Sequence, residues 1–203
     1  MFKKSLLAAA VGVLMSASAA QAAVIFSDNF DAEAPLSLNY TGFANWTVTS
    51  GSVDLIGPGF FDFYPGHGNY VDMDGSTPGL TPASQMTSNL VFGPGAYTLS
   101  FLLGGSQRGD TNTVQATLGD FSSAIVLPSA NPLTLFSFSF TTSVAGNLVF
   151  SDPNTANNFG LILDDVTLSD RALAVPEPLT FSLFGAGLAG VAALRRRKKV
   201  RPA

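Results

Sequence analysis

The stretch from Gly57 to Tyr70, GPGFFDFYPGHGNY, concentrates side chains that could bind a ligand. Its densely spaced glycines and prolines predict a loop rather than a packed strand. Four aromatic residues lie on it: Phe60, Phe61, Phe63 and Tyr64. Flat aromatic faces stack on sugar rings, and Asp62, His67 and Asn69 could bond to sugar hydroxyls. We therefore predict a carbohydrate-binding platform, formed by Phe61, Phe63, Tyr64 and His67. The alternative is that the loop folds back and its rings cover an open end of the core.

Two pairs of acids lie near the ends of the central segment: Asp28 and Asp31 in SDNFD, and Asp164 and Asp165 in LDDV. If the first and last strands pair, these carboxylates become neighbours. Clustered carboxylate and carbonyl oxygens are the ligands that Ca²⁺ prefers. The four acids therefore predict one structural calcium ion. The alternative is that they only terminate strands.

Residues for common catalytic sites are scarce. The chain has no cysteine, His67 is its only histidine, and no serine stands in G-x-S-x-G, which excludes thiol catalysis and argues against hydrolase triads. A glycosidase with two carboxylates stays formally open, with four candidate acids: Asp54, Asp62, Asp72 and Asp74. Aspartates in strands and turns usually bond to local backbone groups or water, so we expect no enzymatic activity.

The charge of the chain is unevenly distributed. The formal net charge is −4, but between Ala23 and Val175 only Arg108 and Arg171 are basic against thirteen acids, which gives −11. Such a surface repels nucleic acid and anionic lipid and attracts divalent cations. Nucleic-acid binding is therefore excluded.

The central segment alternates apolar and polar residues. In TLFSFSFTT, Thr134 to Thr142, three phenylalanines alternate with serines, and AYTLSFLL repeats the pattern. A period of two predicts half-buried strands, and the Gly-Pro-Gly, Gly-Gly and Asp-Pro-Asn stretches predict turns. We expect about ten strands, no helix and one all-β domain, an antiparallel jelly-roll-like β-sandwich over residues 23–171.

The first residues have the pattern of a secretory signal peptide. Lys3 and Lys4 precede an apolar run, and Ala20 and Ala22 form an A-x-A cleavage site. We therefore predict a signal peptide over residues 1–22, cut by signal peptidase.

The last residues carry a second export feature. Val175-Pro-Glu-Pro178 is followed by an apolar run over residues 179–194 and a basic tail over 195–201. The run predicts a short transmembrane helix, and the basic tail is expected to stay cytoplasmic. Residues 172–203 resemble the PEP-CTERM sorting signal of Gram-negative bacteria, which implies recognition at Pro176, Glu177 and Pro178 by exosortase. The alternative is an ordinary single-pass anchor.

The central segment also resembles a known group. SDNFD, WTVTSGSVDLIG, GNYVDMDGS, GAYTLSFLLGGSQRGDTNTVQATLGD and GLILDDVTL are similar to PEP-CTERM proteins related to the plant DUF642 group. The resemblance implies a galactose-binding-like sandwich, with Asp31 and Asp165 as side-chain ligands of calcium.

Together these features predict a non-enzymatic surface or matrix protein. We expect an inner-membrane precursor that is sorted to the cell surface or matrix, where it binds exopolysaccharide. The alternatives are a structural or adhesion component that binds protein, and a secreted glycan hydrolase.

Overall fold

A computed structural model of the protein describes residues 22–170, which form eleven strands and no helix. The strands are β1 (Val24–Asp28), β2 (Trp46–Gly51), β3 (Asp54–Ile56), β4 (Tyr70–Asp72), β5 (Ser84–Phe92), β6 (Gly95–Gly104), β7 (Thr111–Leu118), β8 (Phe121–Pro128), β9 (Thr134–Thr142), β10 (Gly146–Asp152) and β11 (Ile162–Asp170). The predicted signal peptide and the predicted helix over residues 179–194 lie outside the described residues. Within residues 22–170, no helix is long and apolar enough to cross a membrane.

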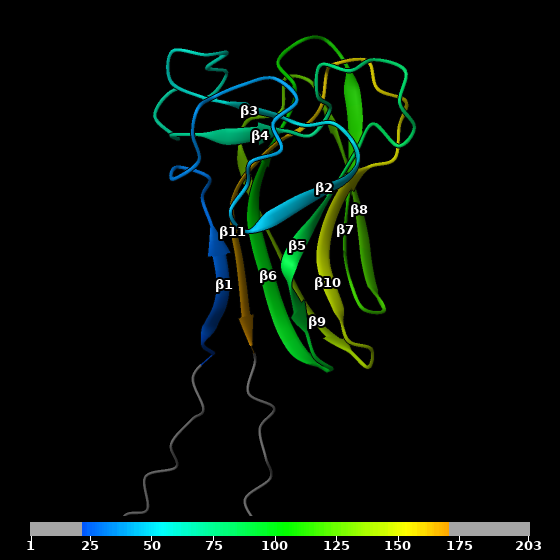
Figure 1. Ribbon diagram of the computed structural model, residues 1–203. Coiled ribbons are helices and arrows are strands. Elements are labelled where there is room, and N and C mark those ends of the chain that lie inside the picture. Colours follow the sequence, from blue (N-terminus) through cyan, green and yellow to red (C-terminus); the bar gives the residue numbers. More distant parts are fainter. Residues whose placement is uncertain (1–21, 171–203) are drawn as a thin grey trace, which may run out of the picture. The chain divides into compact units, whose positions relative to one another are not determined.

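The strands form two antiparallel sheets that face each other (Figure 1). Sheet A has the order β3-β4-β11-β6-β9, with β1 paired to β11 beyond the end of β4. Sheet B has the order β2-β5-β10-β7-β8. The prediction of an all-β antiparallel sandwich is therefore confirmed.

The core lies between the two sheets and follows from the alternation in each strand. In β6, Tyr97, Leu99, Phe101 and Leu103 are buried, whereas the residues between them are partly exposed. In β9, the three phenylalanines pack against the core and the intervening serines are exposed. Because both sheets and their shared core lie within residues 22–170, this segment forms one compact unit.

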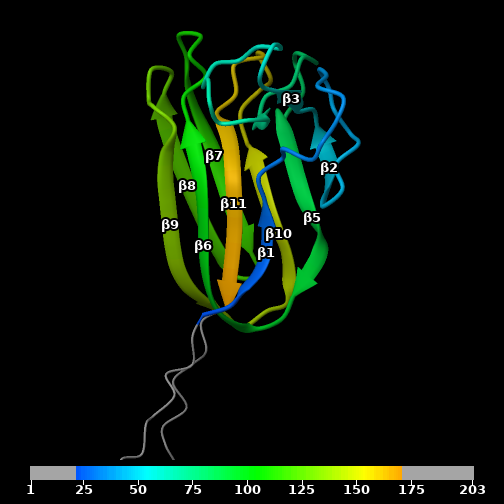
Figure 2. The ribbon, with the colours of Figure 1, turned by 90° about the vertical axis from the view of Figure 1, so that its left-hand side faces the viewer.

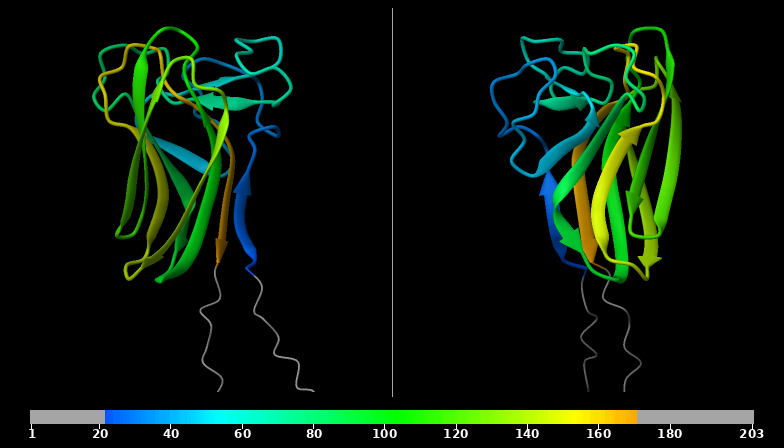
Figure 3. Two further views of the ribbon diagram at one scale, coloured as in Figure 1. Left: turned by 180° about the vertical axis from the view of Figure 1, so that it is seen from behind. Right: turned by 45° about the vertical axis from the view of Figure 1, so that its right-hand side comes forward.

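The two ends of the sandwich differ in their connections. Long loops gather at the upper end in Figure 1, among them residues 57–69, 105–110 and 153–161. The lower end holds short turns, the start of β1 and the end of β11, which lie side by side because Val24 pairs with Ser169. Figure 3 shows the same arrangement from two further sides. The loop end is therefore opposite the end from which the chain continues to its C-terminus.

Candidate functional site

Two carboxylates face each other where β3 pairs with β4. Asp54 and Asp72 are directly opposite in the register, and both side chains are almost fully buried. Like charges in this arrangement repel, and removing a carboxylate from water disfavours its charged form. Burial, and to a smaller extent the charge of Asp54, raise the pKa of Asp72 to about 7 against the opposing effect of the Arg108 guanidinium. The pair therefore requires a positive partner.

Arg108, in the loop between β6 and β7, supplies that charge. Its guanidinium forms an ion pair with Asp72, and its Nε donates to the Ser106 carbonyl at 3.2 Å. The guanidinium carbon also lies 5.0 Å from the ring centroid of Phe63 and 5.3 Å from that of Phe159. Two aromatic rings and one carboxylate therefore hold the guanidinium in place.

Asp54 has neutral partners instead. Its Oδ1 accepts hydrogen bonds from the backbone N–H groups of Asn39, at 2.7 Å, and Ser76, at 3.1 Å. The Ser76 hydroxyl donates to Asp54 Oδ2 at 2.8 Å and lies 3.4 Å from the Asn158 side-chain oxygen. Loops that are distant in sequence are thereby joined at one carboxylate.

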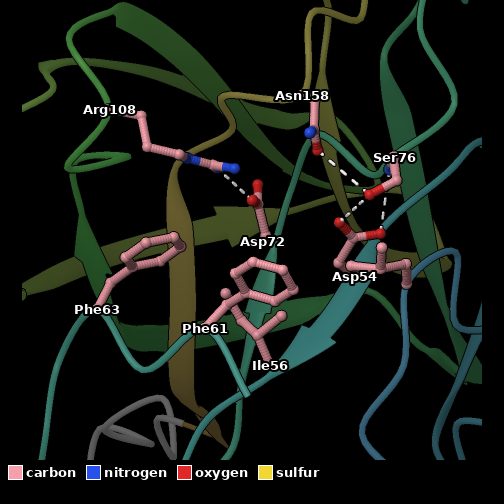
Figure 4. A pocket seen from close by; sticks show the side chains of 9 residues that line it. Asp54, Ile56, Phe61, Phe63, Asp72, Ser76, Arg108 and Asn158 are labelled. Carbon is pink, nitrogen blue, oxygen red and sulfur yellow. Dashed lines mark hydrogen bonds and ion pairs between the residues drawn. The ribbon is translucent and has the colours of Figure 1, made fainter.

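These residues line a cavity of about 80 Å³ (Figure 4). Its polar lining consists of Asp54, Asp72, Ser76, Arg108 and Asn158. Its apolar lining consists of Leu38, Ile56, Phe61 and Phe63. The cavity therefore combines aromatic faces with two carboxylates, a hydroxyl, an amide and a guanidinium. We call it the Arg108 pocket.

The predicted aromatic platform is divided by the structure. Phe60, Phe63 and Tyr64 pack against a small cluster of buried residues on sheet A: Ile56, Tyr70 and Ile162. Phe61 is 55% exposed and lies beside the pocket. Of the four residues of the predicted platform, only Phe61 and Phe63 line the pocket. One part of the loop therefore lies beside the pocket, and the other part packs back onto the sheet.

Tyr64 holds the loop to the rest of the domain. Its hydroxyl lies 2.8 Å from the carbonyl oxygens of both Gly105 and Asn131, to which it can donate, and accepts from Gln107 Nε2 at 2.7 Å. A Cβ on Gly104 would lie 2.5 Å from this hydroxyl, so the glycine permits the close approach. The side chain of Tyr64 is therefore engaged by the protein itself.

The predicted polar residues of the loop lie elsewhere. His67 is exposed and is not part of the pocket lining. Asp62 accepts a hydrogen bond from the Tyr70 hydroxyl at 3.0 Å. Asn69 donates its backbone N–H to Asp31 Oδ1 at 2.8 Å, which ties the loop to the segment after β1. The structure therefore gives Asp62 and Asn69 contacts within the protein.

A second acidic region lies where β1 pairs with β11. The expected pairing of the first and last strands is present, and Asp28 and Asp165 line one pocket of about 430 Å³. Asp28 accepts hydrogen bonds from Trp46 Nε1 at 3.0 Å, Asn45 Nδ2 at 3.1 Å and the Phe30 N–H at 2.9 Å. The Asp28 carboxylate therefore already has three N–H partners.

Asp164 is the most buried acid of this region, with 1% of its surface exposed. Burial, together with the negative charges of Asp165, Asp31 and Asp28, raises the pKa of Asp164 to about 7. Such like-charge crowding fits a bound cation. However, residues 22–170 contain no group of three or more acidic, histidine or cysteine side chains placed to hold a metal ion. Calcium binding here stays a prediction.

Sequence reasoning did not identify Arg108, Ser76 or Asn158 as site residues. Asp54 and Asp72 were considered only as two of the four acids that could form a two-carboxylate glycosidase site. One signal was present: Arg108 is the only lysine or arginine between residues 22 and 170. A single basic residue among thirteen acids is expected to pair with one of them.

Comparisons with known proteins concern the C-terminal end and the fold separately. Residues 174–198 match the PEP-CTERM protein-sorting motif. No curated protein matches the chain by sequence.

Solved structures with a similar fold include carbohydrate-binding modules. The CBM22-1-CBM22-2 tandem domain of Paenibacillus barcinonensis Xyn10C has a TM-score of 0.49 and 11% identity, over 80% of this chain and 49% of that one. The CBM22-1 xylan-binding domain of the same protein has a TM-score of 0.47 and 8% identity, over 75% of this chain and 97% of that one. The CBM22-1-GH10 modules of Clostridium thermocellum Xyn10B, complexed with xylohexaose, have a TM-score of 0.46 and 16% identity, over 76% of this chain but only 30% of that one.

The predicted sorting signal is thus confirmed at the position where it was expected. The chain carries a PEP-CTERM protein-sorting motif at residues 174–198, after an antiparallel β-sandwich of two sheets.

Proposed function

We propose that this protein is an exported, C-terminally sorted surface protein that binds a neutral glycan at the Arg108 pocket. The observation that carries the proposal is the composition of that pocket. Phe61 and Phe63 offer aromatic faces beside the polar groups of Asp54, Ser76 and Asn158. Sugars present apolar ring faces and a rim of hydroxyls, and this pairing of groups suits both.

The size of the pocket limits what enters it. A cavity of about 80 Å³ is well below the roughly 300 Å³ at which pockets enclose a whole small ligand. We therefore expect the hydroxyl-bearing edge of one sugar unit to enter, while a ring face stacks on the exposed side chain of Phe61. The rest of the polysaccharide would remain outside the pocket, which suits recognition along a chain.

The charge of the site favours a neutral polymer. Arg108 is the only lysine or arginine between residues 22 and 170, and it is paired with Asp72. A polymer rich in uronate, sulfate or phosphate would meet a domain with a strong excess of negative charge and no free basic side chain in residues 22–170. The ligand we propose is therefore an uncharged exopolysaccharide.

Binding is favoured over hydrolysis by the state of the two carboxylates. Asp54 and Asp72 are almost fully buried, and each is bonded to other protein groups. A glycosidase requires one carboxyl group to protonate the leaving oxygen and another to attack or to activate water. Neither side chain is free for that role, so we propose a non-catalytic module.

Sorting would bring the module to the glycan. The motif at residues 174–198 supports processing by exosortase. We propose that signal peptidase first removes residues 1–22 and that the precursor is held at the inner membrane until it is processed.

The binding proposal is tested with residues 22–170 on an array of neutral and acidic polysaccharides, followed by titration calorimetry. Phe61→Ala and Asn158→Ala should each weaken binding by about fivefold or more, corresponding to about 1 kcal/mol. Leu90→Ala, at an exposed apolar residue on β5, is the matched control and should bind as the wild type does. Absence of binding to any neutral glycan, or equal binding by all three variants, would overturn the assignment.

Sorting is tested separately in the full-length chain. Replacing Pro176, Glu177 and Pro178 with alanine should leave an unprocessed precursor in the membrane fraction. If this variant has the same size on a gel as the processed wild type and is released to the same extent, processing at the motif is contradicted.

A further inference from the structure

The free edges of the two sheets are not equally protected against pairing with another chain. An exposed edge strand presents unpaired backbone N–H and C=O groups, and proteins shield such edges with short strands, bulges, charges or prolines. In sheet A, β3 has only three residues, and β1 has an irregular register against β11. In sheet B, β2 has an irregular register against β5. These three edges therefore have recognisable protection.

The β9 edge of sheet A has none of these features. Its nine residues pair with β6 in an unbroken register from Thr134 to Thr142, and they include no charged residue and no proline. Figure 2 shows β9 at the left-hand side of the sandwich, away from β2 and β3. Leu135 is 65% exposed on this strand. The β9 edge is therefore long, regular and uncharged.

The neighbouring edge, β8 of sheet B, is less suited to pairing. It is also regular, and Val126 on it is 60% exposed. However, β8 ends in Pro128, which has no N–H to donate to a second copy. The β9 edge is thus the better template of the two.

The distribution of charge indicates which partner could pair with β9. No charged residue occurs from Phe121 to Ser151, whereas the remainder of residues 22–170 carries thirteen acids and one arginine. Two copies of so acidic a domain repel each other at most orientations. The repulsion is smallest when their uncharged edges meet, because the charges then lie farthest apart.

We propose that two copies of this protein associate through their β9 strands, paired antiparallel about a two-fold axis. The pairing satisfies the outward N–H and C=O groups of both strands and joins the two copies of sheet A into one continuous sheet. Leu135 lies on the pairing strand with most of its surface exposed, so contact with the second copy removes apolar surface from water.

The test is sedimentation velocity of residues 22–170, a segment that contains both sheets and their core, over a range of concentrations. The wild type should dimerise, and more strongly at high salt because salt screens the repulsion between acidic copies. Lysines on exposed β9 positions, in Ser137→Lys/Ser139→Lys, should weaken the dimer by about tenfold or more. Thr47→Lys/Thr49→Lys is the matched control, since it adds the same charge at exposed positions of the edge strand β2.

Hydrogen exchange identifies the strand that pairs. The backbone amides of β9 should exchange more slowly as concentration rises, while those of β2 and β8 should not change. A domain that remains monomeric at every concentration, a dimer equally weakened by the control variant, or protection confined to β8 would each overturn the proposal.

Discussion

The two acidic regions of the sandwich contain similar carboxylates in different electrostatic surroundings. At the Arg108 pocket, Asp72 is buried beside Asp54, and the only lysine or arginine between residues 22 and 170 is paired with it. At the β1–β11 pair, Asp164 is equally buried and has Asp165, Asp31 and Asp28 as charged neighbours. The first region contains its own cation, and the second does not.

This difference assigns different partners to the two regions. Where a guanidinium is locked between a carboxylate and two aromatic rings, the site is electrostatically complete and can recognise a neutral ligand by hydrogen bonds and stacking. Where carboxylates crowd together without a basic side chain, a positive charge must come from a proton or from a bound cation. The acid content of a region is therefore less informative than its balance of charge.

The largest effect is expected when the Arg108 pocket loses its arginine, because its carboxylates are then left without a basic side chain, as at the β1–β11 pair. Arg108→Ala leaves Asp72 buried without its partner and should lower the free energy of unfolding by about 3 to 5 kcal/mol, measured by urea denaturation at pH 7. Arg108→Ala/Asp72→Asn should recover part of this loss, because the buried charge is removed as well. A double variant less stable than Arg108→Ala would show that the ion pair is not the cause.

The next effect concerns a buried acid that has no arginine beside it. Asp152 is fully buried, its Oδ2 has no hydrogen-bond partner, and burial raises its pKa to about 6. The folded protein then binds more protons than the unfolded chain between about pH 4 and pH 6, so stability falls as pH rises through this range. The free energy of unfolding should fall by about 3 kcal/mol, because each unit of pKa shift corresponds to about 1.4 kcal/mol.

Unfolding measured at several pH values tests this contribution. Asp152→Asn should reduce the fall between pH 4 and pH 6 by about 3 kcal/mol and retain the part due to Asp72 and Asp164, which continues to about pH 7. An unchanged slope in Asp152→Asn would exclude Asp152 as its source.

Calcium should distinguish the second region from the first. If one ion binds the folded state through Asp31 and Asp165, a concentration 100-fold above its dissociation constant should stabilise the domain by about 2.7 kcal/mol. Asp165→Asn should abolish the rise in Tm on adding calcium, whereas Asn158→Ala at the Arg108 pocket should retain it. Equal Tm values with calcium and with chelator would reject the calcium site.

The smallest effect separates the two parts of the aromatic loop. Tyr64→Phe keeps the ring but removes the hydroxyl that contacts Gly105, Asn131 and Gln107, so it should cost about 1 kcal/mol of stability. Phe61→Ser should leave the Tm nearly unchanged, because its side chain is mostly exposed. Equal destabilisation by both substitutions would show that the loop packs as a single unit.

The strands could be predicted because their signal is local. The alternation of phenylalanine and serine from Thr134 to Thr142 predicts a strand without information from any other part of the chain. Strand β9 has these bounds. The pairing of the first and last strands, which the calcium prediction needed as a condition, is present. The sorting motif is likewise a continuous run of residues, so it could be recognised without a fold.

The aromatic loop could be predicted only in part. Its glycines and prolines correctly indicated a loop, but they do not determine which rings turn inward. Phe63 and Tyr64 are partly buried because Ile56, Tyr70 and Ile162 form an apolar surface beneath them. That surface exists only after β3, β4 and β11 have paired, so no local sequence pattern predicts it.

The sequence alone therefore determined the class of fold through periodicity, the strong negative charge through composition, and the sorting address through a motif that resembles a known signal. Each of these is a property of single segments or of the chain as a whole. The Arg108 pocket was decided by tertiary structure. Asp54, Asp72, Arg108 and Asn158 come from two short strands and two separate loops. The pairing of β3 with β4 makes the two carboxylates neighbours, and the burial that follows makes the one arginine necessary.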